Sequence, residues 1–385
     1  MRVREERTWP LFIGGFLGPF GGSLVTTMLP ELASEFEVSV EVASTTLTAY
    51  LVPFAATMLV SGTLAERIGR RRTVRAAYLV YALASLAAVF APSFEIFFLA
   101  RILQGASNAF TTPVLVGAIT DAVPAHRLNR SLGVFGSLQA LGMAASPLAG
   151  GLAAAVDWRW AFVVCAVVAG VLFFLPPPDS SRAAQTDSRS RWRALANRKL
   201  ALAGFVAGFA YLTTSGILVL TALYARAQFG LTPGLAGVLV AVFGVAGLLT
   251  GRRTGGWMDR FGVLPVGLVV HVVMGLACAA IALTAGLPRT IGVGAVVVLV
   301  GLGGVAGTAC RSTTQNLAVT SAPTNRAGAS SVMLACQFGG SALAPILWVP
   351  VFMGPSPWLA LVLAGVPAII AALALALAWR TVKRR

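Results

Sequence analysis

Long apolar stretches separated by short polar turns run through the whole chain. Each stretch is close to the ~20 residues that a helix needs to cross a bilayer. The pattern predicts twelve spans, at 11–30, 43–62, 73–91, 95–119, 131–153, 159–175, 200–224, 235–254, 263–286, 291–318, 328–350 and 357–379. The chain is therefore predicted to be an all-α membrane protein.

One polar segment is longer than the other turns and divides the chain. Residues 176–199 contain three consecutive prolines, several serines and alternating charges, which is typical of a flexible linker. We predict an N-terminal six-helix half at residues 1–175, a cytoplasmic linker at 176–199 and a C-terminal six-helix half at 200–385.

Two sets of residues recur about half a chain apart. The order Gly, three residues, acid, Arg, apolar residue, Gly begins at Gly62 and again at Gly255, an offset of 193 residues. A Gln, a Gly and a Pro recur 198 residues apart, as Gln139, Gly142 and Pro147 and then as Gln337, Gly340 and Pro345. The repeat predicts two structurally related halves, and a pseudo-twofold axis along the membrane normal is one known arrangement of such halves.

Composition and charge fit a membrane protein. The chain is 57% hydrophobic and only 11% charged, whereas soluble domains have about 25% charged residues. The net charge of +16 comes from basic residues concentrated on one side of the predicted spans, and only Arg159, Arg226 and Arg289 fall on the other side. This distribution places both termini in the cytoplasm and explains the charge without nucleic acid as a partner.

Three motifs resemble those of the major facilitator superfamily, and more narrowly its drug–proton antiporter branch. The loop after span 43–62 is similar to the superfamily signature, with Glu66 in the Asp position. Span 95–119 carries Arg101, Gln104 and Gly105, which resemble the R-x-x-Q-G motif. Span 131–153 is similar to the antiporter motif, through Gly133, Gly142, Ser146, Pro147, Gly150 and Gly151, although the family usually has Gly at position 146.

The loop motif is expected to act as a conformational latch. The resemblance implies that Glu66 caps the start of span 328–350 in one state, and an acid beside a helix N-terminus is worth ~0.3–1 kcal/mol. Arg70 would then pair with Asp121 at the end of span 95–119. The predicted latch comprises Gly62, Glu66, Arg67, Gly69, Arg70, Asp121, Asp259 and Arg260. The alternative is that these charges only orient the protein in the membrane.

The antiporter motif has a physical basis of its own. Its small residues permit close helix contact, and Pro147 removes a backbone hydrogen bond and bends the helix. A bent and closely packed helix between the halves could favour opening of the protein to one side of the membrane. The alternative is that the small residues only allow close packing and do not determine the side of opening.

Two arginines within spans head the list of cavity residues. Gln104 and Asn108 share a helix face with Arg101, and Thr308 and Gln315 share one with Arg311. An arginine inside a membrane should face a cavity or a partner, although Arg101 could instead reach the outer interface. The resemblance implies that the first, fourth, seventh and tenth spans line a central cavity and that the second, fifth, eighth and eleventh flank it. On that arrangement the predicted substrate cavity comprises Thr26, Thr27, Arg101, Gln104, Asn108, Gln139, Tyr211, Thr214, Arg311, Gln337 and Phe338.

No predicted span carries an acid near mid-membrane. The coupling candidates are therefore Glu31 and Asp121, at span ends, and Arg101, which the resemblance associates with proton coupling. With two arginines and no buried acid, the cavity should favour neutral or anionic amphiphiles over lipophilic cations. Coupling to protons is the expectation, and a facilitator that needs no ion is the alternative.

The sequence favours an exporter of small amphiphilic molecules. No protease, hydrolase or nucleotide-binding motif is present, so we expect neither an enzyme nor a cofactor nor a metal. An importer is the second reading, and a membrane receptor or scaffold is a third. The Arg-rich, Ala- and Gly-rich composition suggests a GC-rich bacterial source. We expect a monomer in the bacterial cytoplasmic membrane, with lipid and a small-molecule substrate as its partners.

Overall fold

The computed structural model describes residues 9–123, 125–177 and 195–383, and every element within them is helical. In chain order the helices are α1 (Trp9–Ser23), η1 (Leu24–Thr27), α2 (Leu29–Glu35), α3 (Val40–Ile68), α4 (Arg70–Val89), α5 (Phe94–Asn108), α6 (Thr112–Ala122), α7 (Ala125–Ala154), α8 (Arg159–Phe173), α10 (Arg198–Phe229), α11 (Pro233–Phe261), α12 (Val263–Ile281), η2 (Ala282–Gly286), α13 (Arg289–Ser321), η3 (Pro323–Asn325), α14 (Arg326–Met353) and α15 (Pro357–Lys383).

The lengths and surfaces of these helices fit a membrane. Nine helices of the described residues are long and apolar enough to cross a bilayer, and a bent pair at Trp9–Thr27 and Leu29–Glu35 makes a tenth candidate. Two further apolar helices are shorter, Leu141–Ala154 and Arg159–Phe173. Each of the twelve predicted spans overlaps one helix or a few consecutive helices. Large apolar side chains such as Leu249, Val298 and Leu373 are exposed on the outside of the bundle, where lipid replaces water.

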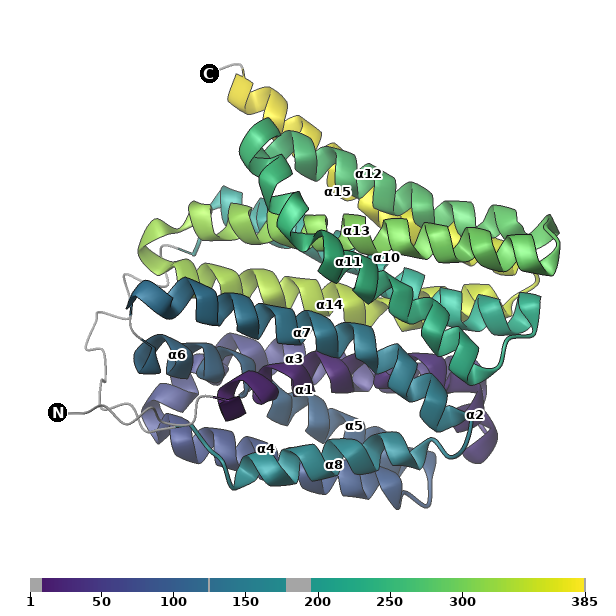
Figure 1. The fold of residues 1–385 in the computed structure, drawn as a ribbon, viewed down its shortest axis with the longest axis horizontal. Helices are drawn as coiled ribbons and strands as arrows, with labels where there is room; N and C mark the ends of the chain where they lie inside the picture. The colour runs from purple at the N-terminus through teal and green to yellow at the C-terminus, as the bar shows by residue number, and fades with distance from the viewer. Residues whose placement is uncertain (1–8, 124, 178–194, 384–385) are drawn as a thin grey trace.

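The helices lie in two groups stacked side by side (Figure 1). Helices α1–α8 form one group, called the N half, and helices α10–α15 form the other, called the C half. We call the end of the bundle that carries Trp9, Gly69 and the end of α15 the basal end. The opposite end, which carries α2 and Gly230, is the distal end. Helices α7 and α11, and helices α3 and α14, pack against each other across the boundary between the halves.

The first and fourth predicted spans are each broken into two helices. Span 11–30 was expected to be continuous, but α1 ends at Ser23 and the chain bends by 68° before α2. The fourth span is interrupted between Asn108 and Thr112. Pro30 and Pro113 stand in the first turns of α2 and α6, where the missing N–H is tolerated. A proline inside a continuous helix would remove a backbone hydrogen bond, so these positions favour a new helix start.

The sequence repeat corresponds to repeated close contacts in the fold. A Cβ at Gly105 of α5 would collide with the backbone carbonyl of Tyr50 on α3. A Cβ at Gly304 of α13 would collide in the same way with the backbone carbonyl of Phe243 on α11. Gly105 and Gly304 stand 199 residues apart in the sequence, so the two halves use a small residue at related positions for the same kind of helix contact.

Candidate functional site

A cavity of about 400 Å³ lies between the two halves. Its walls come from α1, α3, α6 and α7 of the N half and from α10, α13 and α14 of the C half. On α3 the lining residues lie around the middle of the helix, and on α14 they lie from the middle of the helix toward its basal end. A volume of this size is within the usual range for small-molecule sites.

Six of the predicted cavity residues line this space: Gln139, Tyr211, Thr214, Arg311, Gln337 and Phe338. Arg311 is the one charged side chain among the described lining residues. Its Nη2 donates to Oε1 of Gln139 across the boundary between the halves, at 3.4 Å. Among the described residues, no carboxylate lies within salt-bridge distance of Arg311.

The two walls of the cavity differ in chemistry. The C-half wall is mostly polar, and besides Arg311 it carries Tyr211, Thr214, Ser215, Gln315, Ser330, Ser331, Gln337 and Ser341. The N-half wall is mostly apolar, and it carries Pro19, Leu51, Phe54, Met58, Pro113, Val116, Phe135 and Met143. The cavity is therefore amphipathic across the boundary between the halves.

Arg101 lies outside this cavity, behind Tyr50. The Arg101 guanidinium is fully buried and lies over the ring of Tyr50, with Cζ 4.4 Å from the ring centroid. Tyr50 itself lines the cavity. Arg101 Nη1 donates to Oε1 of Gln104 at 2.7 Å, and Nη2 donates to the carbonyl of Gly21 at 3.2 Å. Among the described residues no carboxylate pairs with Arg101, so cation–π contact and neutral acceptors hold this charge.

The rest of the predicted polar stripe belongs to the same buried network. Gln104 Nε2 donates to Oγ of Ser85 at 2.8 Å, and Asn108 Nδ2 donates to the Tyr50 hydroxyl at 2.7 Å. The Tyr50 hydroxyl donates to the carbonyl of Gly18 at 3.2 Å. Arg101, Gln104 and Asn108 therefore join α5 to α1, α3 and α4 instead of facing the cavity.

The antiporter-motif residues of α7 form two contact faces. On the first face, Gly142, Ser146 and Gly150 lie against the backbone of α1 and η1. A Cβ at Gly142 would meet the Phe16 carbonyl, and the Ser146 hydroxyl donates to the Phe20 carbonyl. The predicted cavity residues Thr26 and Thr27 lie at this distal contact, both buried, and Thr27 Oγ1 donates to the Pro147 carbonyl at 2.9 Å.

The second face of α7 contacts the C half at the distal end. A Cβ on Gly151 would meet the Pro233 carbonyl of α11, and a Cβ on Gly237 would lie 2.6 Å from the Pro147 carbonyl. Backbone atoms stand on both sides of this contact, so neither position has space for a larger residue. The motif therefore brings α7 and α11 into direct backbone contact. Gly133 lies in α7 near its basal end.

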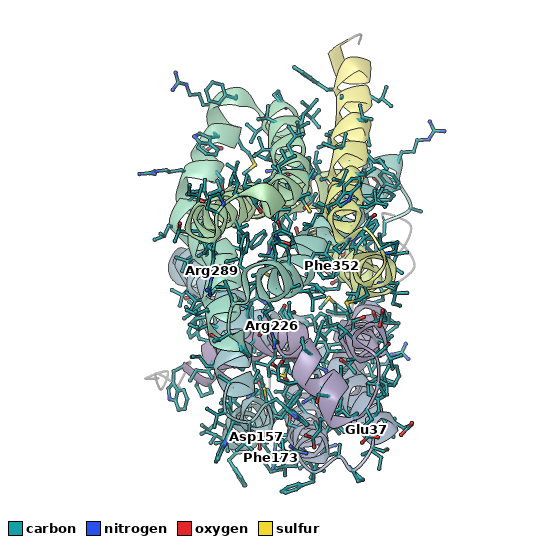
Figure 2. The ribbon with its side chains drawn as sticks, turned by 90° about the vertical axis from the view of Figure 1, so that its right-hand side faces the viewer. Glu37, Asp157, Phe173, Arg226, Arg289 and Phe352 are labelled. Carbon is teal, nitrogen blue, oxygen red and sulfur yellow. The ribbon has the colours of Figure 1, made fainter. Side chains whose placement is uncertain are left out.

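A bidentate ion pair joins the halves at the distal end. Arg226 of α10 donates from Nη2 to Oε1 of Glu31 at 2.6 Å and from Nη1 to Oε2 at 2.8 Å. The Arg226 and Glu31 side chains are only 20% and 21% exposed. Figure 2 shows Arg226 near the middle of the distal face, between the two halves. A second pair, Arg159 with Glu35 at 2.6 Å, lies within the N half.

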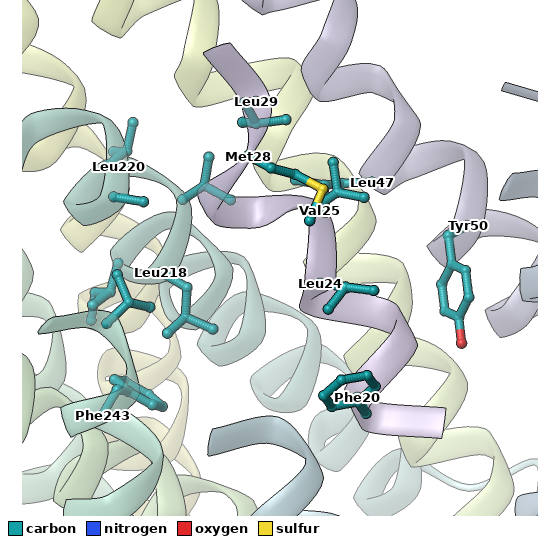
Figure 3. Close-up of a cluster of buried hydrophobic side chains, with 14 of the residues drawn as sticks. Phe20, Leu24, Val25, Met28, Leu29, Leu47, Tyr50, Leu218, Leu220 and Phe243 are labelled. Atoms are coloured by element: carbon teal, nitrogen blue, oxygen red, sulfur yellow. The ribbon is translucent and has the colours of Figure 1, made fainter. Parts of the chain in front are cut away.

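Apolar side chains fill the boundary beside this ion pair. Figure 3 shows part of this filling, with Leu24, Val25 and Met28 on the bent first span and Leu218 and Leu220 on α10. Leu24, Val25, Met28 and Leu220 are fully buried, and all five belong to one continuous core cluster. The apolar cluster, the α7–α11 contact and the ion pair close the bundle on the distal side of the cavity.

The loop motif is only partly described. The side chains of Glu66 and Asp121 lie outside what the structure describes, and so do the surroundings of Gly62. The Arg70 guanidinium lies beside Gly117 of α6, within 3.3 Å of where a Cβ would stand. Gly69 has φ +101° and stands between α3 and α4, which explains its place in the motif. Arg67, Asp259 and Arg260 are exposed at the basal end, and Arg260 lies over the ring of Phe261.

Sequence reasoning overlooked the contribution of α3. Tyr50, Phe54 and Met58 line the cavity, but apolar and aromatic residues in a membrane span look like ordinary packing residues. Their spacing of four places them on one helix face, and this was the available signal. Arg226 was also overlooked as a partner of Glu31, because 195 residues separate them.

The family of the chain follows from a match over most of its length. The family model described as Major Facilitator Superfamily matches residues 11–345. The chain belongs to this superfamily.

Sequence relatives include a protein named for antibiotic resistance and proteins named as transporters. The puromycin resistance protein pur8 of Streptomyces alboniger is 34% identical over 170 residues, covering 43% of this chain and 34% of that protein. The uncharacterized MFS-type transporter Rv1250 of Mycobacterium tuberculosis is 29% identical over 157 residues, covering 40% and 27%. The riboflavin transporter RibZ of Clostridioides difficile is 24% identical over 173 residues, covering 43% and 38%. The match spans about a third of the length of these curated relatives.

Solved structures share the fold over nearly the whole chain. A D-xylose–proton symporter superposes with a TM-score of 0.76 at 17% identity, covering 96% of both chains. A bacterial homolog of the human lysosomal transporter Spinster, in an inward-facing and unoccupied conformation, gives 0.74 at 17% identity, covering 97% and 96%. At this identity the likeness establishes the fold alone.

Proposed function

We propose that the protein is a secondary transporter that exports small amphiphilic molecules by alternating access. This proposal rests on the amphipathic cavity between the halves. The apolar cluster, the α7–α11 contact and the Glu31–Arg226 ion pair close the cavity on its distal side. The substrate enters the cavity from the basal end and leaves at the distal end. Its chemistry is neutral or anionic, because Arg311 is the one charged residue among the described lining residues.

The basal end faces the cytoplasm in this proposal. Arg67, Arg71 and Arg72 are exposed there, and cytoplasmic loops of membrane proteins carry an excess of Arg and Lys. The bacterial relatives support a bacterial cytoplasmic membrane, with both termini in the cytoplasm. In this orientation the structure corresponds to a state that is closed to the outside.

Export is favoured over import by two observations. The small-residue face of α7 resembles the antiporter motif, and it forms the distal contact with α11. Relatives named for puromycin resistance and as a multidrug resistance protein B homolog point the same way. The riboflavin transporter and the sugar symporter keep import or facilitated transport as the alternative.

Proton antiport is the proposed energy source. Glu31 contacts Arg226 at the distal end, between the two halves. A group in that position sets the conformation and does not carry a proton across the membrane by itself. Arg101 and its buried network, and Asp121 at the basal end, remain the candidates for the transfer across the N half.

A susceptibility panel in an efflux-deficient host tests this proposal. Cells expressing the wild type, Arg101→Ala or Arg311→Gln are compared with cells carrying an empty vector, against a neutral phenicol, puromycin, ethidium and fusidate. We expect resistance to the phenicol or fusidate with the wild type. At equal expression, Arg101→Ala should lose either resistance, and Arg311→Gln should lose resistance to the anionic fusidate. Greater sensitivity with the wild type than with the empty vector would indicate import and contradict export. Resistance to ethidium as strong as that to the phenicol would contradict the predicted charge preference.

A further inference from the structure

The two chemically different walls of the cavity suggest more than a general amphiphile site. The polar wall belongs to the C half and the apolar wall to the N half, so a bound molecule touches both halves at once. A molecule with one polar end and one apolar end has a single favourable orientation in such a cavity. Its polar end faces α13 and its apolar body faces α3 and α7.

The polar wall is built for an anion. The planar guanidinium of Arg311 has five donors, and its hydrogen bond among the described residues is the long one to Gln139 at 3.4 Å. Gln315 and Gln337 line the same wall, and Gln315 Nε2 already donates to Ser330 Oγ at 2.7 Å. Carboxylates and sulfonates accept paired hydrogen bonds from guanidinium in a way that neutral groups cannot match.

The apolar wall is suited to a flat ring system. Phe54 of α3 belongs to this wall, and it meets Phe338, an apolar lining residue of α14 in the C half, edge to face, with ring centroids 4.6 Å apart. Phe135, Met58 and Met143 complete the wall. Aromatic rings and flexible thioethers give favourable contacts to aromatic ligands of varied outline.

The second buried cation does not compete for the anion. Arg101 lies behind the Tyr50 ring and is already bonded to Gln104 and Gly21. The described lining of the cavity therefore presents one cationic position, which suits a single negative charge.

We propose that the substrate is a compact aromatic monoanion that binds with its acidic group at Arg311 and its rings against Phe54 and Phe135. This assignment rests on the proposed export function and narrows its substrate class. The acidic group competes with Gln139 for Arg311. Binding thus replaces the 3.4 Å hydrogen bond between Arg311 on α13 and Gln139 on α7 with contacts that run through the substrate. A bound substrate therefore changes how the two halves are joined.

Binding to the purified protein in lipid nanodiscs tests the assignment. The probes are 1-anilinonaphthalene-8-sulfonate, which is anionic, and N-phenyl-1-naphthylamine, which has the same ring system without the sulfonate. We expect Arg311→Gln to weaken sulfonate binding at least tenfold and to change binding of the neutral amine by less than twofold. Phe54→Ala weakens both. Arg289→Gln, an exposed arginine on the same helix, is the matched control and leaves both affinities unchanged.

A second measurement uses the wild type alone, so it is independent of how well the variants fold. The matched ligands 2-naphthoate, 2-naphthylmethanol and 2-naphthylmethylamine are tested for displacement of the sulfonate probe. We expect the anion to displace the probe at concentrations at least tenfold below those of the alcohol and the cation. Equal displacement by all three, or no displaceable probe binding to the wild type, would overturn the anion assignment. Resistance to a neutral phenicol together with equal displacement would leave export standing and refute this assignment alone.

Discussion

The distal ion pair gives the sharpest prediction about the conformational cycle. Glu31 on α2 and Arg226 on α10 join the halves at the distal end through two short hydrogen bonds. Replacing Glu31 by Gln keeps the size of the side chain and removes the charge that attracts Arg226. The distal end must separate for export, so the loss of this pair favours the distal-open state.

The expected size of the effect follows from the burial of the pair. Fully exposed ion pairs contribute about 0.2–1 kcal/mol, and hydrogen bonds to charged groups contribute about 1.5–3 kcal/mol. The side chains of Glu31 and Arg226 are 21% and 20% exposed, which places this bidentate pair between the two classes, at about 1–2 kcal/mol. The ratio of distal-open to distal-closed protein should therefore rise roughly 5- to 30-fold.

Distances between spin labels, measured by double electron–electron resonance, check this prediction. Spin labels at Val156 and Thr290, both exposed at the distal end and in opposite halves, report the separation of the halves. Cys336 is exposed and is replaced by Ser, while Cys165, Cys278 and Cys310 are buried. Glu31→Gln should increase the population with the longer distance.

A nearby ion pair supplies the matched control. Arg159 and Glu35 also lie at the distal end, at 2.6 Å, but both belong to the N half. Glu35→Gln therefore removes the same kind of bond without joining or releasing the halves. The reasoning is refuted if both variants shift the distance distribution equally, or if Glu31→Gln leaves it unchanged.

Three further predictions follow from close contacts. Gly237→Ala places a Cβ 2.6 Å from the Pro147 carbonyl, so it should separate α7 from α11, raise the distal-open population and slow efflux. As the control, Gly234→Ala meets Leu152 at an ordinary 3.6 Å, and it should match the wild type in the spin-label distances and in efflux. Tyr50→Phe removes the hydroxyl that accepts from Asn108, which should cost about 1–2 kcal/mol and lower the thermal unfolding temperature by a few degrees; an unchanged unfolding temperature would contradict the network. Arg101→Ala leaves Gln104 Oε1 without its 2.7 Å donor. Because Arg311 is only half-buried, Arg101→Ala should lower the thermal unfolding temperature more than Arg311→Gln does in the same detergent.

The sequence predicted the helical membrane fold because hydropathy and span length depend on local composition. It also predicted which α7 residues allow close contact, since small residues at a spacing of four define a helix face. It could not predict which helix meets each face. The contact of Gly151 with Pro233, and that of Glu31 with Arg226, depend on how the two halves pack together.

The cavity residues show the same division between local and long-range information. Arg311, Gln139 and Gln337 were predicted because polar residues are costly in a membrane and stand out in apolar spans. Arg101 met the same criterion, yet the structure places it behind Tyr50. The sequence does not encode whether a buried polar residue faces a cavity or a neighbouring helix, because that depends on the rotation of each helix. Breaks in the first and fourth spans were signalled by Pro30 and Pro113, but hydropathy alone runs through them.

Uptake by inside-out membrane vesicles tests the central claim most directly, because it preserves the orientation of the protein. Respiring vesicles with an acidic interior are given tritiated 1-anilinonaphthalene-8-sulfonate, with empty-vector vesicles as background. The account predicts accumulation with the wild type that nigericin abolishes, and none with Arg311→Gln at equal expression. Accumulation that persists after the proton gradient is collapsed, or that is equal in Arg311→Gln, would contradict proton-driven export through the Arg311 cavity.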